Sequence, residues 1–150
     1  MAHSYAALFI HYIFSAKNRQ HLITPDIEPR VWKYLGGIAR DNDMKSLAAG
    51  GTSNHIHMLV ELPRTMFVAK GIQLIKTGSS NWISETFKSL NDFEWQRGYG
   101  AFTVSVSRIE PTIEYIKNQK EHHRHRTFKE EYLLFLDKHG VDYDKRYVLD

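Results

Sequence analysis

The chain lacks cysteine, internal repeats, low-complexity segments and any apolar run long enough to cross a bilayer. Without cysteine, a disulfide framework and a thiolate zinc site are both excluded, and a secreted protein has no support. The N-terminal stretch YAALFIHYIF has no basic flank before it and leads directly into Lys17 and Arg19. It therefore predicts neither a signal peptide nor a membrane span, and we expect a cytoplasmic protein without membrane association.

The length of 150 residues suits a single domain over 1–150, with no room for a second catalytic module. The net charge of +3 and the pI near 9.1 are only a weak indication of a polyanionic partner. The distribution of charge indicates more, because residues 117–129 are dense in basic side chains and hold one acid, Glu121. This stretch predicts contacts with DNA phosphates, Arg124 among them, and the alternative is a solvated helix end.

Hydrophobic patterning divides the chain into alternating strands and helices. A nearly continuous apolar run predicts a central strand at its start, and strict alternation predicts the last strand. The expected strands are 5–14, 44–51, 54–62 and 102–107, and the expected helices are 28–41, 66–88, one that carries Tyr115, and 128–140.

The order β-α-β-β-α-β predicts an α+β fold of the ferredoxin-like, RRM-like kind, an antiparallel sheet with additional C-terminal helices. Alternation within 54–62 places Ile56, Met58 and Val60 toward the two helices and leaves His55 and His57 on the open face. We expect the C-terminal helices, of this subunit or of a partner, to cover that face.

The segment His55-Ile56-His57 is the most informative motif in the chain. Two imidazoles on one face of a strand make half of a metal site. The alternative is a pair of histidines that only form hydrogen bonds on a half-exposed face. Burying imidazoles within an apolar strand is costly unless something satisfies them, which favours ligation.

Tyr115 and Gln119 are four residues apart and therefore share a helix face. Over the histidine face they would add a nucleophile and a third ligand, a set that suits attack on a phosphodiester held on a divalent cation. The alternatives are a tyrosine that fills the core and a surface amide. His122 and His123 are candidates for proton transfer or for phosphate contact. The alternative is that they do neither.

Three strings spread over most of the chain carry a family resemblance: HIHMLVEL at 55–62, WQRGYGAFTVSVS at 95–107 and EYIKNQKEHH at 114–123. With them the chain resembles the single-tyrosine HUH (His-hydrophobic-His) transposases of the smallest bacterial insertion sequences and their relatives associated with repetitive extragenic palindromes (REP). Asn54 departs from the family pattern, where many members have Asp.

The resemblance implies a transposase that cleaves and rejoins single-stranded DNA through a 5′-phosphotyrosine on Tyr115. It implies Mg²⁺ or Mn²⁺ held by His55, His57 and Gln119. It also implies a DNA hairpin at the ends of the element as substrate, and a homodimer in which the tyrosine helix of one subunit completes the site of the other.

Basic and aromatic side chains elsewhere are candidates for DNA contact. Trp95 and Tyr99 would stack on unpaired bases, with core packing as the alternative. The candidates for backbone phosphate are Lys17, Arg19, Lys76, Arg97 and Arg124, each with a solvated charge as the alternative.

Two other functions stay open. A replication initiator or relaxase would use the same HUH chemistry, but the short chain and the absence of a third histidine in the motif argue against it. A non-catalytic or domesticated single-strand nucleic-acid binding module would use the sheet alone, and the aromatic signature of such sheets is missing from the candidate strands.

Overall fold

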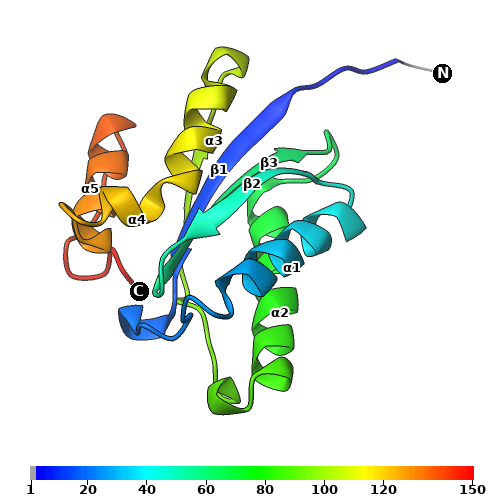
Figure 1. Cartoon of the computed structure of the whole chain (residues 1–150). Helices are drawn as coiled ribbons and strands as arrows, with labels where there is room; N and C mark the ends of the chain where they lie inside the picture. The colour runs from blue at the N-terminus through cyan, green and yellow to red at the C-terminus, as the bar shows by residue number, and fades with distance from the viewer. Residues whose placement is uncertain (1–2) are drawn as a thin grey trace.

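The computed structural model describes residues 3–150, and its centre is a four-stranded antiparallel sheet (Figure 1). The strands are β1 (Leu8–Ser15), β2 (Lys45–Gly51), β3 (His55–Leu62) and β4 (Gly100–Thr103), in the spatial order β2-β3-β1-β4. β1 pairs with β3 on one side and with β4 on the other, so it is central as predicted. β2 and β3 form the predicted hairpin, and the ferredoxin-like α+β fold is confirmed.

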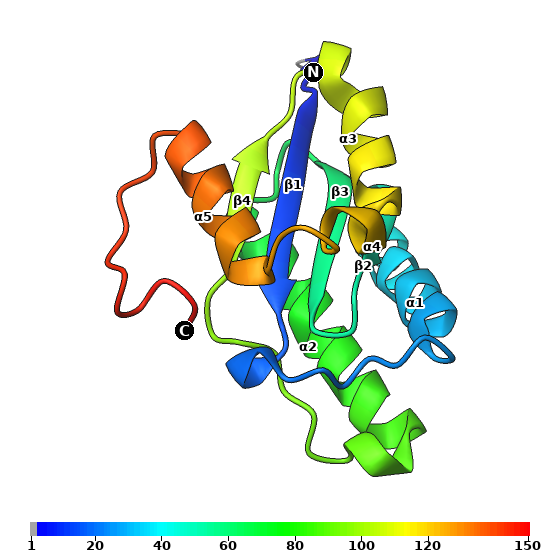
Figure 2. The same cartoon turned by 60° about the vertical axis from the view of Figure 1, so that its left-hand side comes forward.

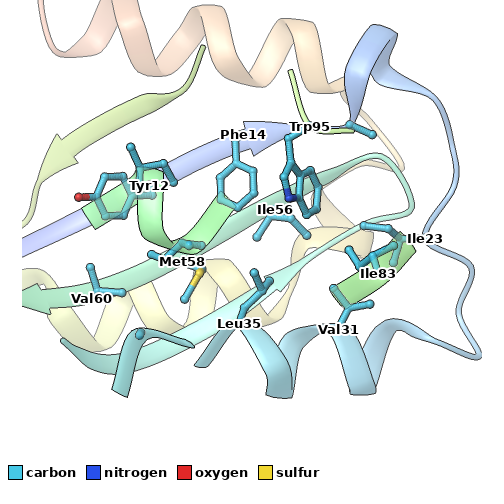
Figure 3. Close-up of a cluster of buried hydrophobic side chains, with 14 of the residues drawn as sticks. Tyr12, Phe14, Ile23, Val31, Leu35, Ile56, Met58, Val60, Ile83 and Trp95 are labelled. Atoms are coloured by element: carbon cyan, nitrogen blue, oxygen red, sulfur yellow. The ribbon is translucent and has the colours of Figure 1, made fainter. Parts of the chain in front are cut away.

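Two helices, α1 (Glu28–Asp41) and α2 (Val68–Thr86), pack on one face of this sheet. Figure 3 shows the core between these helices and the sheet, where Tyr12 and Phe14 of β1 meet Ile56, Met58 and Val60 of β3. All five side chains are fully buried. The predicted direction of the β3 side chains is therefore confirmed, because the alternation of a strand sends its histidines to the opposite face.

Three further helices cover that opposite face: α3 (Ile109–Lys117), α4 (Gln119–His122) and α5 (Phe128–Lys138). In Figure 2, α3 and α4 lie beside β3 and β2, whereas α5 lies over β1 and β4. Glycines permit this close approach, since a Cβ on Gly50 would lie 2.7 Å from the Ile116 carbonyl oxygen and one on Gly100 would lie 2.7 Å from the Tyr132 ring. The open face is thus covered within one chain.

The fourth strand differs from its prediction over 102–107. It begins at Gly100 and ends at Thr103, because the chain bends at Ser105 into a short 3-10 helix, η3 (Val106–Arg108), that leads into α3. The alternating Val and Ser residues continue past the edge of the sheet, where Val106 is exposed. Alternation predicted the type of element here but not its end, which the return of α3 across the sheet decides.

The remaining elements follow the prediction closely. The first strand begins three residues later than expected, and α2 runs without a break through Gly78. Within this helix Ser79 donates a hydrogen bond to the Ile75 carbonyl oxygen. Short 3-10 helices also occur at η1 (Lys17–Arg19) and η2 (Lys88–Leu90).

Candidate functional site

The site begins on β3, where His55 and His57 point to the face covered by α3, α4 and α5. Both side chains are fully buried. Their rings lie 5.3 Å apart, centroid to centroid, and nearly at right angles. The two imidazoles predicted to share one face therefore do so in a closed interior rather than on a half-exposed surface.

Hydrogen bonds at Nδ1 orient both rings. The Nδ1 atom of His55 lies 2.8 Å from Asn54 Oδ1 and 2.9 Å from the Thr52 hydroxyl. The Nδ1 atom of His57 lies 2.8 Å from Nε2 of His11, a buried histidine on β1. With Nδ1 occupied, Nε2 is the atom that each ring presents to the centre, as in ligands of protein metal sites. The asparagine found in place of the family's aspartate still supplies the oxygen that this arrangement uses.

The third member of the centre is Glu131 of α5, which was not among the residues predicted from the sequence. Its Oε1 lies 2.9 Å from His57 Nε2 and 3.6 Å from His55 Nε2, and its side chain is 3% exposed. One ligand atom from each of these residues lies within 4.8 Å of the others. Two imidazoles and a carboxylate match the ligands that divalent transition metals prefer, so this buried His-His-Glu group could hold a metal ion.

A signal for Glu131 existed in the sequence. It lies three residues after Phe128 and four before Phe135, and therefore on the apolar stripe of the final helix. A carboxylate on a buried stripe needs cationic or hydrogen-bonding partners. Without the tertiary structure, however, Glu131 could not be distinguished from its exposed neighbour Glu130.

The predicted ligand Gln119 lies at the same centre. Its side chain is buried, and its Oε1 is 3.0 Å from His55 Nε2. Its Nε2 donates to the Tyr115 carbonyl oxygen at 3.3 Å, so the two residues keep their shared face although the helix is interrupted at Asn118.

Tyr115 also reaches the centre, where its hydroxyl donates a hydrogen bond to Oε2 of Glu131. Its ring stacks on His122 with centroids 4.4 Å apart and meets His57 edge-on at 5.8 Å. Burial first, and then the charge of Glu131, raises the pKa of the Tyr115 hydroxyl well above its ordinary value. The phenol is therefore neutral and hydrogen-bonded to a carboxylate.

The protonation of the centre suits a cation. Burial, followed by the neighbouring His57, lowers the pKa of His55 to about 3. Burial alone would raise the pKa of the Glu131 carboxyl, but the charge and hydrogen bonds of His57, His123 and Tyr115 hold it well below its usual range. A neutral imidazole and an ionised carboxylate are the forms that ligate metals.

A pocket of about 620 Å³ opens beside the tyrosine. We call it the tyrosine pocket; its lining includes Tyr115, Glu131, His11, Arg108, Arg126 and Lys138. The cations on its wall would attract a phosphate group toward the tyrosine hydroxyl. His123, one of the two candidates for proton transfer, lies with Nε2 3.2 Å from Glu131 Oε1.

A second, larger cavity of about 1000 Å³ lies between η1, α2, the loop before β4 and the C-terminal segment. We call it the basic groove. Four of the five predicted phosphate contacts line it: Lys17, Arg19, Lys76 and Arg97. They come from distant parts of the sequence, and Lys129, Lys145 and Arg146 join them.

Three of the predicted contacts have partners within the chain. The Lys17 ammonium pairs with Glu94 Oε2 at 2.7 Å. The Lys76 ammonium donates to three successive carbonyl oxygens, of Gln96, Arg97 and Gly98, and so holds the loop that forms one wall of the groove. Arg124 lies outside the groove, in the connection between α4 and α5, where it pairs with Glu121 at 3.4 Å.

The two aromatic candidates for base stacking lie in different environments. Trp95 is buried between Phe14 and Phe93, and its indole nitrogen donates to Ser79 at 2.9 Å, so the core-packing alternative holds for it. Tyr99 is partly buried on the wall of the basic groove.

None of the helices formed by residues 3–150 combines the length and the apolar composition that crossing a membrane requires.

The fold and this centre define a ferredoxin-like α+β protein with a buried His-His-Glu group beside a tyrosine hydroxyl. A family model described as "Transposase IS200 like" matches residues 4–119, and the chain belongs to this family of single-tyrosine transposases. The resemblance drawn from the three sequence strings is thereby confirmed, and the protein is a transposase, a DNA-processing enzyme.

Relatives and solved structures agree with this family. Transposases for insertion sequence element IS200 from Salmonella typhimurium strain LT2 and from Salmonella typhi are each 30% identical over 128 residues, covering 81% of this chain and 82% of theirs. A candidate transposase from Deinococcus radiodurans R1 is 21% identical, with a TM-score of 0.65 over 79% of this chain and 96% of that one. A REP-associated tyrosine transposase bound to a REP hairpin is 14% identical, with a TM-score of 0.59 over 82% of this chain and 73% of that one.

The family match ends at Gln119, so it contains both histidines, the tyrosine and the glutamine but not α5. Glu131, the carboxylate of the centre, comes from the segment beyond it.

Proposed function

We propose that this transposase cleaves and rejoins single-stranded DNA through a 5′-phosphotyrosine formed on Tyr115. One observation carries the proposal: a single carboxylate, Glu131, accepts a hydrogen bond from the tyrosine hydroxyl through Oε2 and faces the paired histidines through Oε1. The nucleophile and the candidate metal ligands are thereby held in contact by one side chain. A tyrosine that only filled the core would also need an acceptor for its hydroxyl, but not one shared with the candidate metal ligands.

The chain's own residues would carry the following step. The Tyr115 oxygen attacks the scissile phosphorus, its proton passes to Glu131 Oε2, and the bond from phosphorus to the 3′ oxygen breaks. The 3′ oxygen takes up a proton from solvent water and leaves as a free hydroxyl, and the 5′ phosphate stays on the tyrosine. Because the phosphotyrosyl ester retains the energy of the broken bond, another 3′ hydroxyl can reverse the step and join new ends without ATP.

Four side chains would hold the divalent cation: His55, His57, Glu131 and Gln119. When bound, the cation supplies polarisation of the scissile phosphate. Oxygen ligands from protein and substrate favour Mg²⁺ or Mn²⁺, and the two imidazoles favour Mn²⁺ over Mg²⁺.

A single-stranded DNA hairpin is the substrate we propose. The similarity to a transposase described as bound to a REP hairpin supports it, as do the cations of the basic groove. Arg19 and Arg97 would contact the backbone phosphates of the hairpin, while the cations of the tyrosine pocket would contact the strand to be cut. We expect a folded hairpin to be preferred over the matching duplex in competition binding at fixed salt.

The centre is complete within one chain, with Tyr115 beside its own His57. We therefore propose cleavage in cis, in place of the exchange of helices between subunits that the resemblance implied. The homodimer stays a prediction that light scattering of the free protein would test.

The decisive experiment incubates the protein with end-labelled single-stranded hairpins and Mn²⁺ or Mg²⁺ and separates the products by denaturing electrophoresis. A covalent protein–DNA band is the expected result, and Tyr115→Phe should remove it while hairpin binding stays within a few fold of wild type. Tyr143→Phe is the matched control, because that hydroxyl bonds Asp137 on the surface. It should form the adduct at the wild-type rate.

Two outcomes would contradict the proposal. Full adduct formation by Tyr115→Phe would assign the nucleophile to another tyrosine, with Tyr99 and Tyr132 next to test. Hairpin binding without any adduct across the substrates and both metals would instead favour the non-catalytic binding module.

A further inference from the structure

A third histidine adjoins the centre from a different strand. His11 lies on β1, is 3% exposed, and its Nε2 is 2.8 Å from His57 Nδ1. Ile13 is the strand partner of His57, so His11 is its diagonal neighbour, within reach on the same face. The two rings are tilted by 43° with centroids 5.0 Å apart, a geometry that directs one ring nitrogen toward the other rather than stacking the rings.

The contact bears on which nitrogen of His57 carries its proton. A neutral imidazole has one N–H and one lone pair, and a ligating Nε2 needs the proton on Nδ1. That proton needs an acceptor because the ring is fully buried. For His57 the neighbour at Nδ1 is the Nε2 atom of His11.

The two metal-facing histidines are therefore supported in different ways. His55 is held by Asn54 and Thr52, which are close to it in the sequence. His57 is held by a residue 46 positions away, on the neighbouring strand. The His11 ring packs at right angles to the Phe135 ring, with 5.2 Å between centroids, and it lines the tyrosine pocket.

We propose that His11 is the positioning residue for His57: its Nε2 accepts the Nδ1 proton of His57 and so keeps His57 Nε2 available as a metal ligand. This inference rests on the metal centre of the proposed function. It adds a role for a residue that lies outside the HUH motif. The Nε2 atom of this residue faces His57 rather than the metal centre.

Calorimetric titration with Mn²⁺ tests it on the whole protein. His11→Phe keeps the ring shape but removes the acceptor, and should weaken Mn²⁺ binding about 10- to 100-fold, the usual effect of removing a partner of a metal ligand. His11→Gln places an amide oxygen near the position of Nε2 and should restore affinity to within a few fold of wild type. His139→Phe is the control, because His139 lines the same pocket but hydrogen-bonds the Phe135 carbonyl oxygen.

A spectroscopic readout keeps the test sound if His11→Phe folds poorly. Long-range ¹H–¹⁵N correlation spectra of the Zn²⁺-loaded wild-type protein should show His57 protonated at Nδ1 and His11 unprotonated at Nε2. Zn²⁺ is used because it is diamagnetic and accepts the same ligands. Melting temperatures measured with EDTA report any purely structural effect separately.

The outcomes separate this inference from the proposed function. A wild-type protein that binds Mn²⁺ and forms the DNA adduct, alongside a folded His11→Phe variant with the same Mn²⁺ affinity, would overturn the role of His11 alone. So would a His57 protonated at Nε2 in the Zn²⁺-loaded protein. Failure of the wild type to bind Mn²⁺ would overturn the metal centre, and this inference with it.

Discussion

Replacing Glu131 by glutamine changes one buried atom and should disable the chemistry of the site. The substitution keeps the shape of the side chain but removes its charge, and with it the acceptor of the Tyr115 proton. Loss of a positioned general base lowers rates by about 10²- to 10⁴-fold, which corresponds to about 3–5 kcal/mol in the activation barrier. The tyrosine cannot compensate by ionising on its own, because burial, the largest cause of its raised pKa, remains in the variant.

The assay for Glu131→Gln is the single-turnover rate of adduct formation on a labelled hairpin at saturating Mn²⁺. Saturation separates the loss of the base from the weaker metal binding that is also expected. The metal-free variant should lose about 1.5–3 kcal/mol of unfolding free energy, the usual contribution of hydrogen bonds to a charged group.

The neighbouring residue provides a matched control. Glu130 is exposed and accepts a hydrogen bond from the Thr127 hydroxyl, so Glu130→Gln changes the same atoms one position away. It should form the adduct at the wild-type rate. If Glu131→Gln also formed the adduct at the wild-type rate, the carboxylate would have no part in activating the tyrosine. The proposal that Glu131 accepts the Tyr115 proton would then be refuted.

Four further predictions concern the same molecule. His57→Ala should abolish Mn²⁺ binding in calorimetry, and Gln119→Ala should weaken it less because water can replace an amide oxygen; unchanged titrations would exclude the site. Mixing Tyr115→Phe with His57→Ala should not restore cleavage if the site acts in cis, whereas recovered adduct would show exchange between subunits. Since the pKa of His55 is lowered from 6.5 to about 3, the folded state binds fewer protons between these values, and its stabilising contribution, complete above pH 6.5, is lost as pH falls toward 3. Metal-free unfolding should therefore cost about 2 kcal/mol less at pH 4.5 than at 6.5 from this residue alone, and an identical pH slope in His55→Asn would contradict it. Finally, Arg97→Ala should weaken hairpin binding and reduce the salt dependence by about one phosphate contact, which an unchanged salt slope would disprove.

Local patterns in the sequence were sufficient for most of the architecture. The helix over 28–41, the central first strand and the hairpin ending in HIHMLVEL follow from periodicity and turn residues, which act between near neighbours. The end of the fourth strand did not follow, because Val104 and Ser105 alternate like a strand but lie where the chain turns back over the sheet.

The pairing of His55 with His57, and of Tyr115 with Gln119, was determined by the sequence itself, because strand and helix geometry set which side chains share a face at spacings of two and four. Only the tertiary structure decided that Glu131 joins them, that His11 supports His57, and that Arg19 and Arg97 share a groove. These contacts link residues far apart in the chain. Although Glu131 lies on the apolar stripe of α5, the stripe alone does not show that Glu131, and not Glu130, meets the histidines. Packing of α5 against β1 and β4 makes that distinction, since it buries one carboxylate among imidazoles and leaves the other in water.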